Sequence, residues 1–324
     1  MPDAKRPSVL VTGAGGYIGA GTIDELAARR DEFSAIVALD VREVPPPQRR
    51  GGVHHLTGDI RNAAIEATFR EHKIDTVVHL ASIVTPGKKP NRDFEYSVDV
   101  LGTRNVVECC LRANVSHVIV ASSGAAYGYH ADNPQPLHED DTLRGNPEFA
   151  YADHKRQVEE MLAGYRRTHP QLKQLVLRPC TILGASTSNQ ITALFERKAV
   201  LGVSGASTPF VFIWDRDVVA CIVKGIVERR EGIYNLAGDG TLTMREIAGM
   251  LHKRYIAVPP TLLTAALGAL KIAGLTQYGP EQVNFLRYRP VLANGRLKRE
   301  FGYTPQKSTA ETFQFYARSK GLLL

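Results

Sequence analysis

Short apolar runs alternate with amphipathic segments through the first half of the chain. Runs rich in Val, Ile and Leu are typical of parallel strands that a sheet buries on both faces, and the segments between them carry apolar residues at helical spacing. This alternation predicts an α/β fold with a doubly wound parallel sheet. The predicted strands are residues 9–11, 35–39, 53–56, 76–80, 118–121 and 172–177, and the predicted helices among them are 62–72 and 98–113.

The alternation weakens after residue 177. Beyond about residue 180, loops rich in Gly, Ser and Thr mix with helices, which we predict at 244–255 and 261–273. We therefore expect residues 1–180 to form the sheet domain and residues 181–324 a smaller C-terminal domain. The stretches 211–213 and 233–236 have strand character, so the segment 210–236 is expected to rejoin the sheet.

Three glycines follow the first predicted strand at intervals of three residues. Gly13 allows a tight turn, Gly16 lets backbone N–H groups approach a diphosphate, and Gly19 lets the next helix pack on its strand. The helix then points the positive end of its dipole at two phosphates. This strand, turn and helix predict a dinucleotide-binding site.

A carboxylate ends the second predicted strand. Asp40 comes 21 residues after Gly19, where dinucleotide folds place the acid that holds the adenosine ribose hydroxyls. The sequence therefore predicts a Rossmann-type domain that binds NAD, because a 2′-phosphate would meet this carboxylate. Arg42 follows two residues later and keeps NADP open as the alternative cofactor.

The bulk composition is that of a globular protein. The 324 residues are 44% hydrophobic and 23% charged, with a net charge of +7 and a pI near 9.2. The basic residues are scattered in short clusters without interleaved aromatic residues. We therefore expect a solvated surface and a phosphate-bearing cofactor, with no nucleic-acid partner.

Cysteines and acidic residues give no metal-ligand spacing. The four cysteines, at 109, 110, 180 and 221, lack paired spacing and suit a reducing compartment, so we expect a cytoplasmic protein in which each is a small buried hydrophobe. Residues 1–8 lack the apolar core of a signal peptide. The acidic run 138–141 is interpreted as an exposed acidic loop or helix start, and no metal is predicted.

One apolar stretch, residues 256–275, is long but interrupted. Pro259, Pro260 and Lys271 leave its uninterrupted part too short to span a bilayer, so no membrane span is predicted. We expect a core helix or a wall of an apolar pocket there, with contact to a membrane surface as the alternative.

Tyr151 and Lys155 are four residues apart, so on a helix their side chains lie on one face. A phenol is a poor base at neutral pH, but a nearby ammonium and an oxidised nicotinamide stabilise the phenolate, and Tyr151 can then take a hydroxyl proton as hydride leaves. Ser122 and Ser123 directly follow a predicted strand, where a hydroxyl can hydrogen-bond the substrate oxygen.

These features fall within a longer set of matching segments. They are TGAGGYIG at 12–19, GDI at 58–60, VHLA at 78–81, GTRN at 102–105, SSGAAYG at 122–128, YADHK at 151–155, RP at 178–179, Gly184 and YNL at 234–236. In this combination the chain resembles the extended short-chain dehydrogenase/reductase family, which includes NAD-dependent epimerases and dehydratases and 3β-hydroxysteroid dehydrogenase-like enzymes.

The resemblance implies roles for individual residues. By this resemblance the catalytic group would be Ser123, Tyr151 and Lys155, and Lys155 would also bind the nicotinamide ribose. Asp59 and Ile60 would contact the adenine, Leu80 and Ala81 would form the wall under the cofactor, and Pro179 would contact the nicotinamide through its backbone. The cofactor-binding set is then Gly13, Gly16, Tyr17, Ile18, Gly19, Asp40, Arg42, Asp59, Ile60, Leu80, Ala81, Tyr151, Lys155 and Pro179.

Departures from the family pattern bear on the substrate. Gly124 and Ala125 stand where dehydratases of the family carry an Asp-Glu pair, so elimination of water lacks its acid and base. Thr181 and Phe210 replace an Asn and an Arg that commonly hold the diphosphate of a nucleotide sugar, although Arg289 can supply one such contact.

Two further departures lie beside the cofactor and on the catalytic helix. Asp99 stands where the family commonly has Asn, and His154 stands where Ser or Thr is frequent. We interpret His154 as a histidine on the helix surface rather than a catalytic one.

The sequence thus predicts an NAD-dependent oxidoreductase acting at a secondary alcohol or ketone. A sugar or nucleotide-sugar epimerase or dehydrogenase is the main hypothesis, and a 3β-hydroxysteroid dehydrogenase-like enzyme of a less polar alcohol is the alternative. A non-catalytic redox sensor that binds NAD(P) is a third hypothesis.

The oligomeric state is expected from two helices, 98–113 and 152–165. Their apolar residues extend beyond a single buried face and include Val107, Leu111, Val158, Met161 and Leu162. We therefore expect a homodimer packed through this pair of helices.

Overall fold

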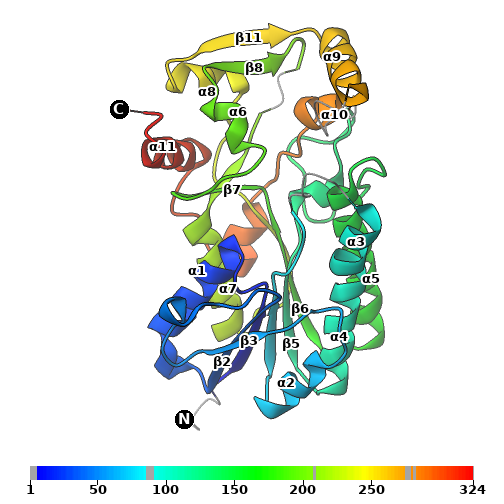
Figure 1. Cartoon of the computed structure of the whole chain (residues 1–324), viewed down its shortest axis with the longest axis vertical. Helices are drawn as coiled ribbons and strands as arrows, with labels where there is room; N and C mark the ends of the chain where they lie inside the picture. The colour runs from blue at the N-terminus through cyan, green and yellow to red at the C-terminus, as the bar shows by residue number, and fades with distance from the viewer. Residues whose placement is uncertain (1–5, 85–90, 207–208, 274–278, 280–281, 324) are drawn as a thin grey trace.

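A parallel sheet of seven strands forms the centre of the fold (Figure 1). In the computed structural model, which describes residues 6–84, 91–206, 209–273, 279 and 282–323, the strand order is β10-β6-β5-β4-β1-β2-β3, and every neighbouring pair is parallel. This confirms the predicted Rossmann-type sheet. Its strands are β1 (Ser8–Thr12), β2 (Ala35–Asp40), β3 (His54–Thr57), β4 (Thr76–His79), β5 (His117–Ala121), β6 (Lys173–Pro179) and β10 (Gly232–Leu236).

Helices cover both faces of this sheet because its strands are apolar on both sides. One face packs on α1 (Tyr17–Ala28), α7 (Asp215–Val227) and η5 (Leu297–Phe301). The other packs on α2 (Ile65–Glu71), α4 (Thr103–Arg112) and α5 (Ala150–Thr168), as Figure 1 shows. Short helical segments complete this part: η1 (Arg30–Glu32), η2 (Pro46–Gln48), α3 (Arg92–Tyr96), η3 (Ser97–Gly102) and η4 (Gly124–Tyr127).

A smaller part lies beyond the carboxyl ends of the strands and has its own aromatic core (Figure 1). Phe195 contacts the rings of Phe210, Phe212 and Phe313, with centroids 5.3 to 6.1 Å apart. Its elements are β7 (Thr181–Leu183), α6 (Thr192–Glu196), β8 (Ala199–Val203), β9 (Phe212–Trp214), α8 (Met244–Met250), β11 (Arg254–Val258), α9 (Pro260–Ile272), α10 (Gln282–Arg287) and α11 (Thr309–Ser319).

The segment 210–236 divides between the two parts. β10 joins the central sheet beside β6, and α7 packs on the sheet, but β9 pairs with β7 outside it. The expectation that residues 211–213 rejoin the sheet is therefore wrong. Phe212 explains the difference, because its ring stacks between Phe210 and Phe313 in the aromatic core of the smaller part.

The helix predicted at 244–255 is shorter than expected. Thr243 and Glu246 form a capping box that starts α8 at Met244, but the helix ends at Met250 and His252 has a φ of +52°. Residues 254–258 instead pair in parallel with β8 as strand β11.

Three of the five apolar residues behind the homodimer expectation are buried within the chain. Val107, Val158 and Leu162 are buried in the core between the sheet and helices α4 and α5. These three offer no surface to a second copy, whereas Leu111 and Met161 are only partly buried, so the homodimer stays a prediction. Cys109, Cys110 and Cys221 are buried as expected, whereas Cys180 is only partly buried, and all four thiols are free.

Candidate active site

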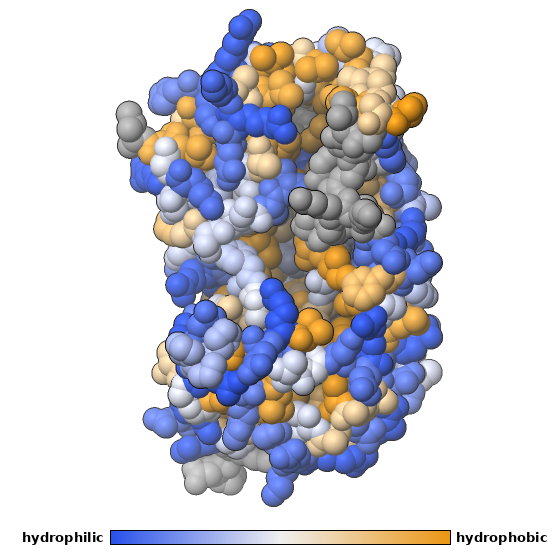
Figure 2. All heavy atoms as spheres, viewed as in Figure 1, coloured by the Kyte–Doolittle hydropathy of each residue, from blue (hydrophilic) through white to orange (hydrophobic). Residues whose placement is uncertain are grey.

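The predicted site residues gather at the carboxyl edge of the sheet. The glycine turn follows β1, Leu80 and Ala81 follow β4, Ser123 follows β5, and Pro179 ends β6. The strand order reverses between β1 and β4, and open α/β sheets form their ligand crevice at such a point. Figure 2 shows that the molecule is hollowed between this edge and the smaller part.

The glycine turn fits a diphosphate because side chains have no room there. Gly13 has a φ of +69°, and a Cβ on it would lie 2.6 Å from the backbone nitrogen of Ala81. A Cβ on Gly19 would overlap the carbonyl oxygen of Gly13. The turn therefore presents bare backbone at the start of α1, as a dinucleotide phosphate site requires.

Asp40 is fixed beside this turn. Its carboxylate accepts hydrogen bonds from the backbone N–H groups of Gly15, at 2.9 Å, and Arg42, at 3.0 Å. The Arg42 guanidinium donates to the carbonyl oxygen of Gly15 at 2.9 Å and lies 3.3 Å from Asp40. Gly15 is a residue that sequence reasoning missed, although it lies within the glycine-rich motif.

Substituting Gly19 by Ala is expected to weaken NAD binding at least about tenfold, because the new methyl group would push the Gly13 carbonyl out of the turn. Calorimetric titration with NAD measures this change. Gly164→Ala is the control, since a Cβ on Gly164 meets no atom within 4 Å. Equal NAD affinity of the Gly19→Ala variant and the parent would contradict the assignment of the turn.

The residues predicted on the adenine side lie beyond the turn. Asp59 pairs with Arg61 at 2.6 Å, and this arginine holds the pKa of Asp59 below its usual value. Ile60 is buried, and its carbonyl oxygen accepts a hydrogen bond from Asn105 at 2.7 Å. Arg61, which lies over the ring of Phe94 at 5.0 Å, was not predicted from the sequence.

Tyr17 ties the glycine turn to the smaller part. Its hydroxyl donates to Asp215 at 2.6 Å and accepts from Thr187 at 3.0 Å. Burial, reinforced by Asp215, raises the pKa of Tyr17 to about 12. The loop after β7 is thereby held beside the start of α1, an arrangement that the sequence did not reveal.

Tyr151 and Lys155 come together as the helical spacing predicts, and Ser123 contacts Tyr151 from the end of β5. Both Tyr151 and Lys155 lie on α5, with the Lys155 ammonium 5.6 Å from the centroid of the Tyr151 ring. Lys155 also donates to the carbonyl oxygen of Ala121, the last residue of β5, at 2.8 Å. Ser123 follows that strand, and its oxygen accepts from the backbone of Ala125 at 3.1 Å.

Burial affects the ionisation of both Tyr151 and Lys155. Burial raises the pKa of Tyr151, and the Ser123 hydroxyl opposes this rise. Burial also lowers the pKa of Lys155, and the nearby carboxylates of Asp99 and Glu159 oppose this decrease. Burial within the chain thus favours the protonated phenol, and the phenolate that the sequence analysis expects depends on the oxidised nicotinamide as well as on Lys155.

Ser122 has a different role from Ser123. Its hydroxyl donates to Glu159, which lies one helical turn after Lys155 and is buried. Glu159 forms a two-point ion pair with Arg178, with donor–acceptor distances of 2.8 and 2.6 Å. This buried pair links α5 to β6, one helical turn from Lys155 of the predicted catalytic group.

Most of the chain matches a known protein family. The sequence model of the NAD dependent epimerase/dehydratase family matches residues 9–237. The chain belongs to this family. Members depend on NAD, so the prediction of NAD as the cofactor is confirmed.

Individual relatives are similar over different spans. An uncharacterised protein of Mycobacterium tuberculosis is 23% identical over 319 residues, covering 97% of this chain and 84% of that protein. A UDP-glucose 4-epimerase of Erwinia amylovora is 31% identical over 194 residues, covering 57% of this chain and 56% of that enzyme. The solved structure of dTDP-glucose 4,6-dehydratase from Bacillus anthracis with NAD has a TM-score of 0.74 at 18% identity, covering 97% and 96% of the two chains. This likeness confirms the fold.

Asp99 and His154 form a buried pair. His154 is buried, so its predicted surface position is wrong, and its Nδ1 lies 3.1 Å from Asp99 Oδ2. Asp99 also accepts from Ser82 at 3.0 Å and from the backbone of Ile83 at 2.8 Å. Although burial opposes it, these partners and the charge of Lys155 hold the pKa of Asp99 below its usual value. The pair fixes the end of β4 against α5.

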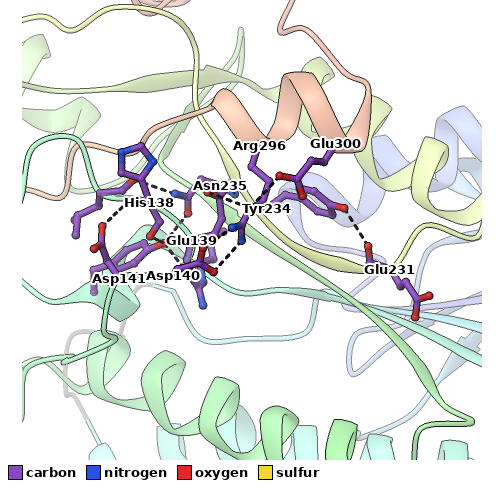
Figure 3. Close-up of polar contacts among 12 residues, drawn as sticks. His138, Glu139, Asp140, Asp141, Glu231, Tyr234, Asn235, Arg296 and Glu300 are labelled. Atoms are coloured by element: carbon purple, nitrogen blue, oxygen red, sulfur yellow. Dashed lines mark hydrogen bonds and ion pairs between the residues drawn. The ribbon is translucent and has the colours of Figure 1, made fainter.

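The acidic run is only partly exposed, and Figure 3 shows its polar contacts. Asp140 pairs with Arg296 at 2.5 Å and is exposed, but Glu139 is buried and accepts from the backbone of Asn235 at 2.9 Å. The expectation of an exposed loop is therefore wrong for Glu139. Within the described ranges, no three His, Cys, Asp or Glu side chains are arranged to hold a metal ion.

Proposed function

We propose that this member of the epimerase/dehydratase family is an enzyme that exchanges hydride between NAD and a secondary alcohol or ketone of a sugar or nucleotide sugar. The product is either the epimer of the substrate or the released ketone. The observation that carries this proposal is the meeting of Ser123, Tyr151 and Lys155 at the same sheet edge as the glycine turn.

Each member of the group has a distinct task in the proposed reaction. Bound NAD supplies the hydride acceptor. Tyr151 takes the proton of the substrate hydroxyl or returns it to the ketone, and Ser123 donates a hydrogen bond to the same substrate oxygen. Lys155 is held toward the phenol by the Ala121 carbonyl, and its ammonium stabilises the phenolate when the proton has left.

Arg289 favours a substrate that carries phosphate. It is buried between the rings of Phe210 and Phe285, at 4.3 and 4.6 Å from their centroids. One nitrogen donates to Thr181 at 3.0 Å, whereas the other terminal nitrogen has no hydrogen-bond partner among the described residues. Burial lowers the pKa of Arg289 to about 10, so it stays charged at neutral pH and can bind a diphosphate.

A panel of substrates tests the proposed function. Sugar nucleotides, free sugars and hydroxysteroids are incubated with the protein and NAD or NADP, and reduced-nicotinamide absorbance is followed together with product stereochemistry. We expect turnover of a sugar nucleotide with NAD. Turnover of a hydroxysteroid alone would support the 3β-hydroxysteroid dehydrogenase-like alternative, which the phenylalanines around Arg289 favour.

The substitution Arg289→Met is expected to raise the KM for the sugar nucleotide that turns over by about 10- to 100-fold, because it removes charged hydrogen bonds to phosphate. The kcat should change much less. Steady-state kinetics measure both constants, and Arg318→Met, at an exposed position of α11, is the control. An unchanged KM would show that the diphosphate binds elsewhere.

A redox sensor that binds NAD without catalysis is the remaining hypothesis. It would need no acid or base for a substrate, so the retention of Ser123, Tyr151 and Lys155 at one edge of the sheet weighs against it.

A homodimer through α4 and α5 and a cytoplasmic location stay predictions. Light scattering at micromolar concentration tests the homodimer, and a monomer mass would contradict it.

A further inference from the structure

The helix α9 presents apolar side chains to solvent. None of its 13 residues, all of which the structure describes, is buried. Leu262 is 60% exposed, Leu270 42% and Ile272 91%. Of the expectations for this stretch, a core helix is therefore wrong, whereas the wall of an apolar pocket and contact with a membrane surface stay predictions. An apolar outward face of this kind marks a surface that contacts something other than water.

The neighbouring sheet of β8 and β11 continues this surface. Leu201 and Ile256 are paired in register, so their side chains project from the same face, and they are 44% and 38% exposed. Val200 and Tyr255, which alternate with them, pack instead into the aromatic core. In Figure 2 hydrophobic residues accordingly gather at the end of the molecule that Figure 1 marks with β8, β11 and α9.

Positive charge flanks these apolar side chains. Arg197 and Lys198 are exposed directly before β8, and exposed Arg254 begins β11, where it pairs in register with Ala199. The three cations therefore lie at one end of the two-stranded sheet. From residue 247 to residue 273 the sequence contains no Asp or Glu. We name this region, from the cations through Leu201 and Ile256 to α9, the α9 surface.

We propose that the α9 surface binds the face of a lipid bilayer that contains anionic headgroups. Such a bilayer accommodates both halves of the surface, since exposed Leu and Ile side chains enter the headgroup boundary while Arg and Lys meet lipid phosphates. The attachment is peripheral, because among the residues that the structure describes no helix has the length and hydropathy of a membrane span. The proposal is independent of the substrate of the active site.

Sedimentation with vesicles tests this proposal on the full chain. We expect binding to vesicles of phosphatidylcholine mixed with phosphatidylglycerol, and much weaker binding to phosphatidylcholine alone. The double variant Leu262→Ser/Ile272→Ser should bind at least about tenfold more weakly. The double variant Lys198→Glu/Arg254→Glu should lose affinity about tenfold or more for the anionic vesicles only.

Val227→Ser is the matched control, because Val227 is 43% exposed on α7, away from the α9 surface. It should bind vesicles as the parent does, and NAD affinity of every variant reports that the fold is intact. Absence of parent binding to anionic vesicles, or equal binding of parent and apolar double variant, would overturn the proposal. Conversion of a parent dimer to a monomer by the apolar substitutions, without lipid, would also overturn it, because a second copy would then cover the surface.

Discussion

Replacing Tyr151 by Phe is expected to lower kcat/KM for the sugar substrate about 10²- to 10⁴-fold, the contribution typical of a positioned general acid or base. The ring would keep its place at the start of α5, so NAD affinity should stay within about twofold of the parent. Steady-state kinetics and calorimetric titration measure the two quantities. A large loss of kcat/KM with an almost unchanged NAD affinity distinguishes a catalytic phenol from a structural one.

Tyr165→Phe is the matched control for this substitution. Tyr165 lies on the same helix, 14 residues after Tyr151, and its hydroxyl donates to Glu108 at 3.1 Å. Its removal should leave kcat/KM unchanged. If the Tyr151→Phe variant retained full activity and still bound NAD, the redox-sensor hypothesis would gain support. The proposed role of Tyr151 as general acid and base would be contradicted.

Replacing Arg178 by Met is expected to lower the free energy of unfolding by about 3–5 kcal/mol, because Glu159 would remain buried without its cation. Urea denaturation measures this loss. Adding Glu159→Leu to Arg178→Met should restore part of the stability, since the uncompensated charge is then gone.

Arg156→Met is the control for the buried pair. Arg156 pairs with Asp153 and Glu160 on the same helix, but its side chain is 25% exposed, and such pairs contribute about 0–1 kcal/mol. A loss below about 1 kcal/mol for Arg178→Met would show that Glu159 reaches water or becomes protonated.

Much of the sheet could be predicted from the sequence because its signals are local. The run Val9–Leu10–Val11 is buried on both faces, and such runs predict a parallel strand without knowledge of their neighbours. The same reasoning failed for residues 211–213. An apolar run does not reveal its pairing partner, and aromatic packing on Phe313, about 100 residues away, decided it here.

The candidate site was predictable where spacing alone sets the geometry. Helical periodicity brings Tyr151 and Lys155 together, and the glycine interval places the turn. Periodicity did not reveal that His154 meets Asp99, since the two are 55 residues apart and come together only when α5 packs against η3. The position of Arg289 between two rings depends likewise on tertiary packing.

The charge state of the phenol also depends on packing. The sequence supplies a lysine that favours phenolate, but burial of both groups works against their charged forms and is not visible in a motif. Positive charge on the oxidised nicotinamide of bound NAD would shift this balance toward phenolate. NAD binding is therefore expected to lower the pKa of Tyr151.

A structure of the protein with NAD bound tests the central claim most directly. The account predicts the diphosphate against the backbone of Gly13 and Gly16, and the nicotinamide ring beside the Tyr151 hydroxyl and the Lys155 ammonium, with room for a substrate oxygen within hydrogen-bond reach of Ser123. A nicotinamide ring placed away from Tyr151, or a diphosphate bound outside the glycine turn, would contradict it.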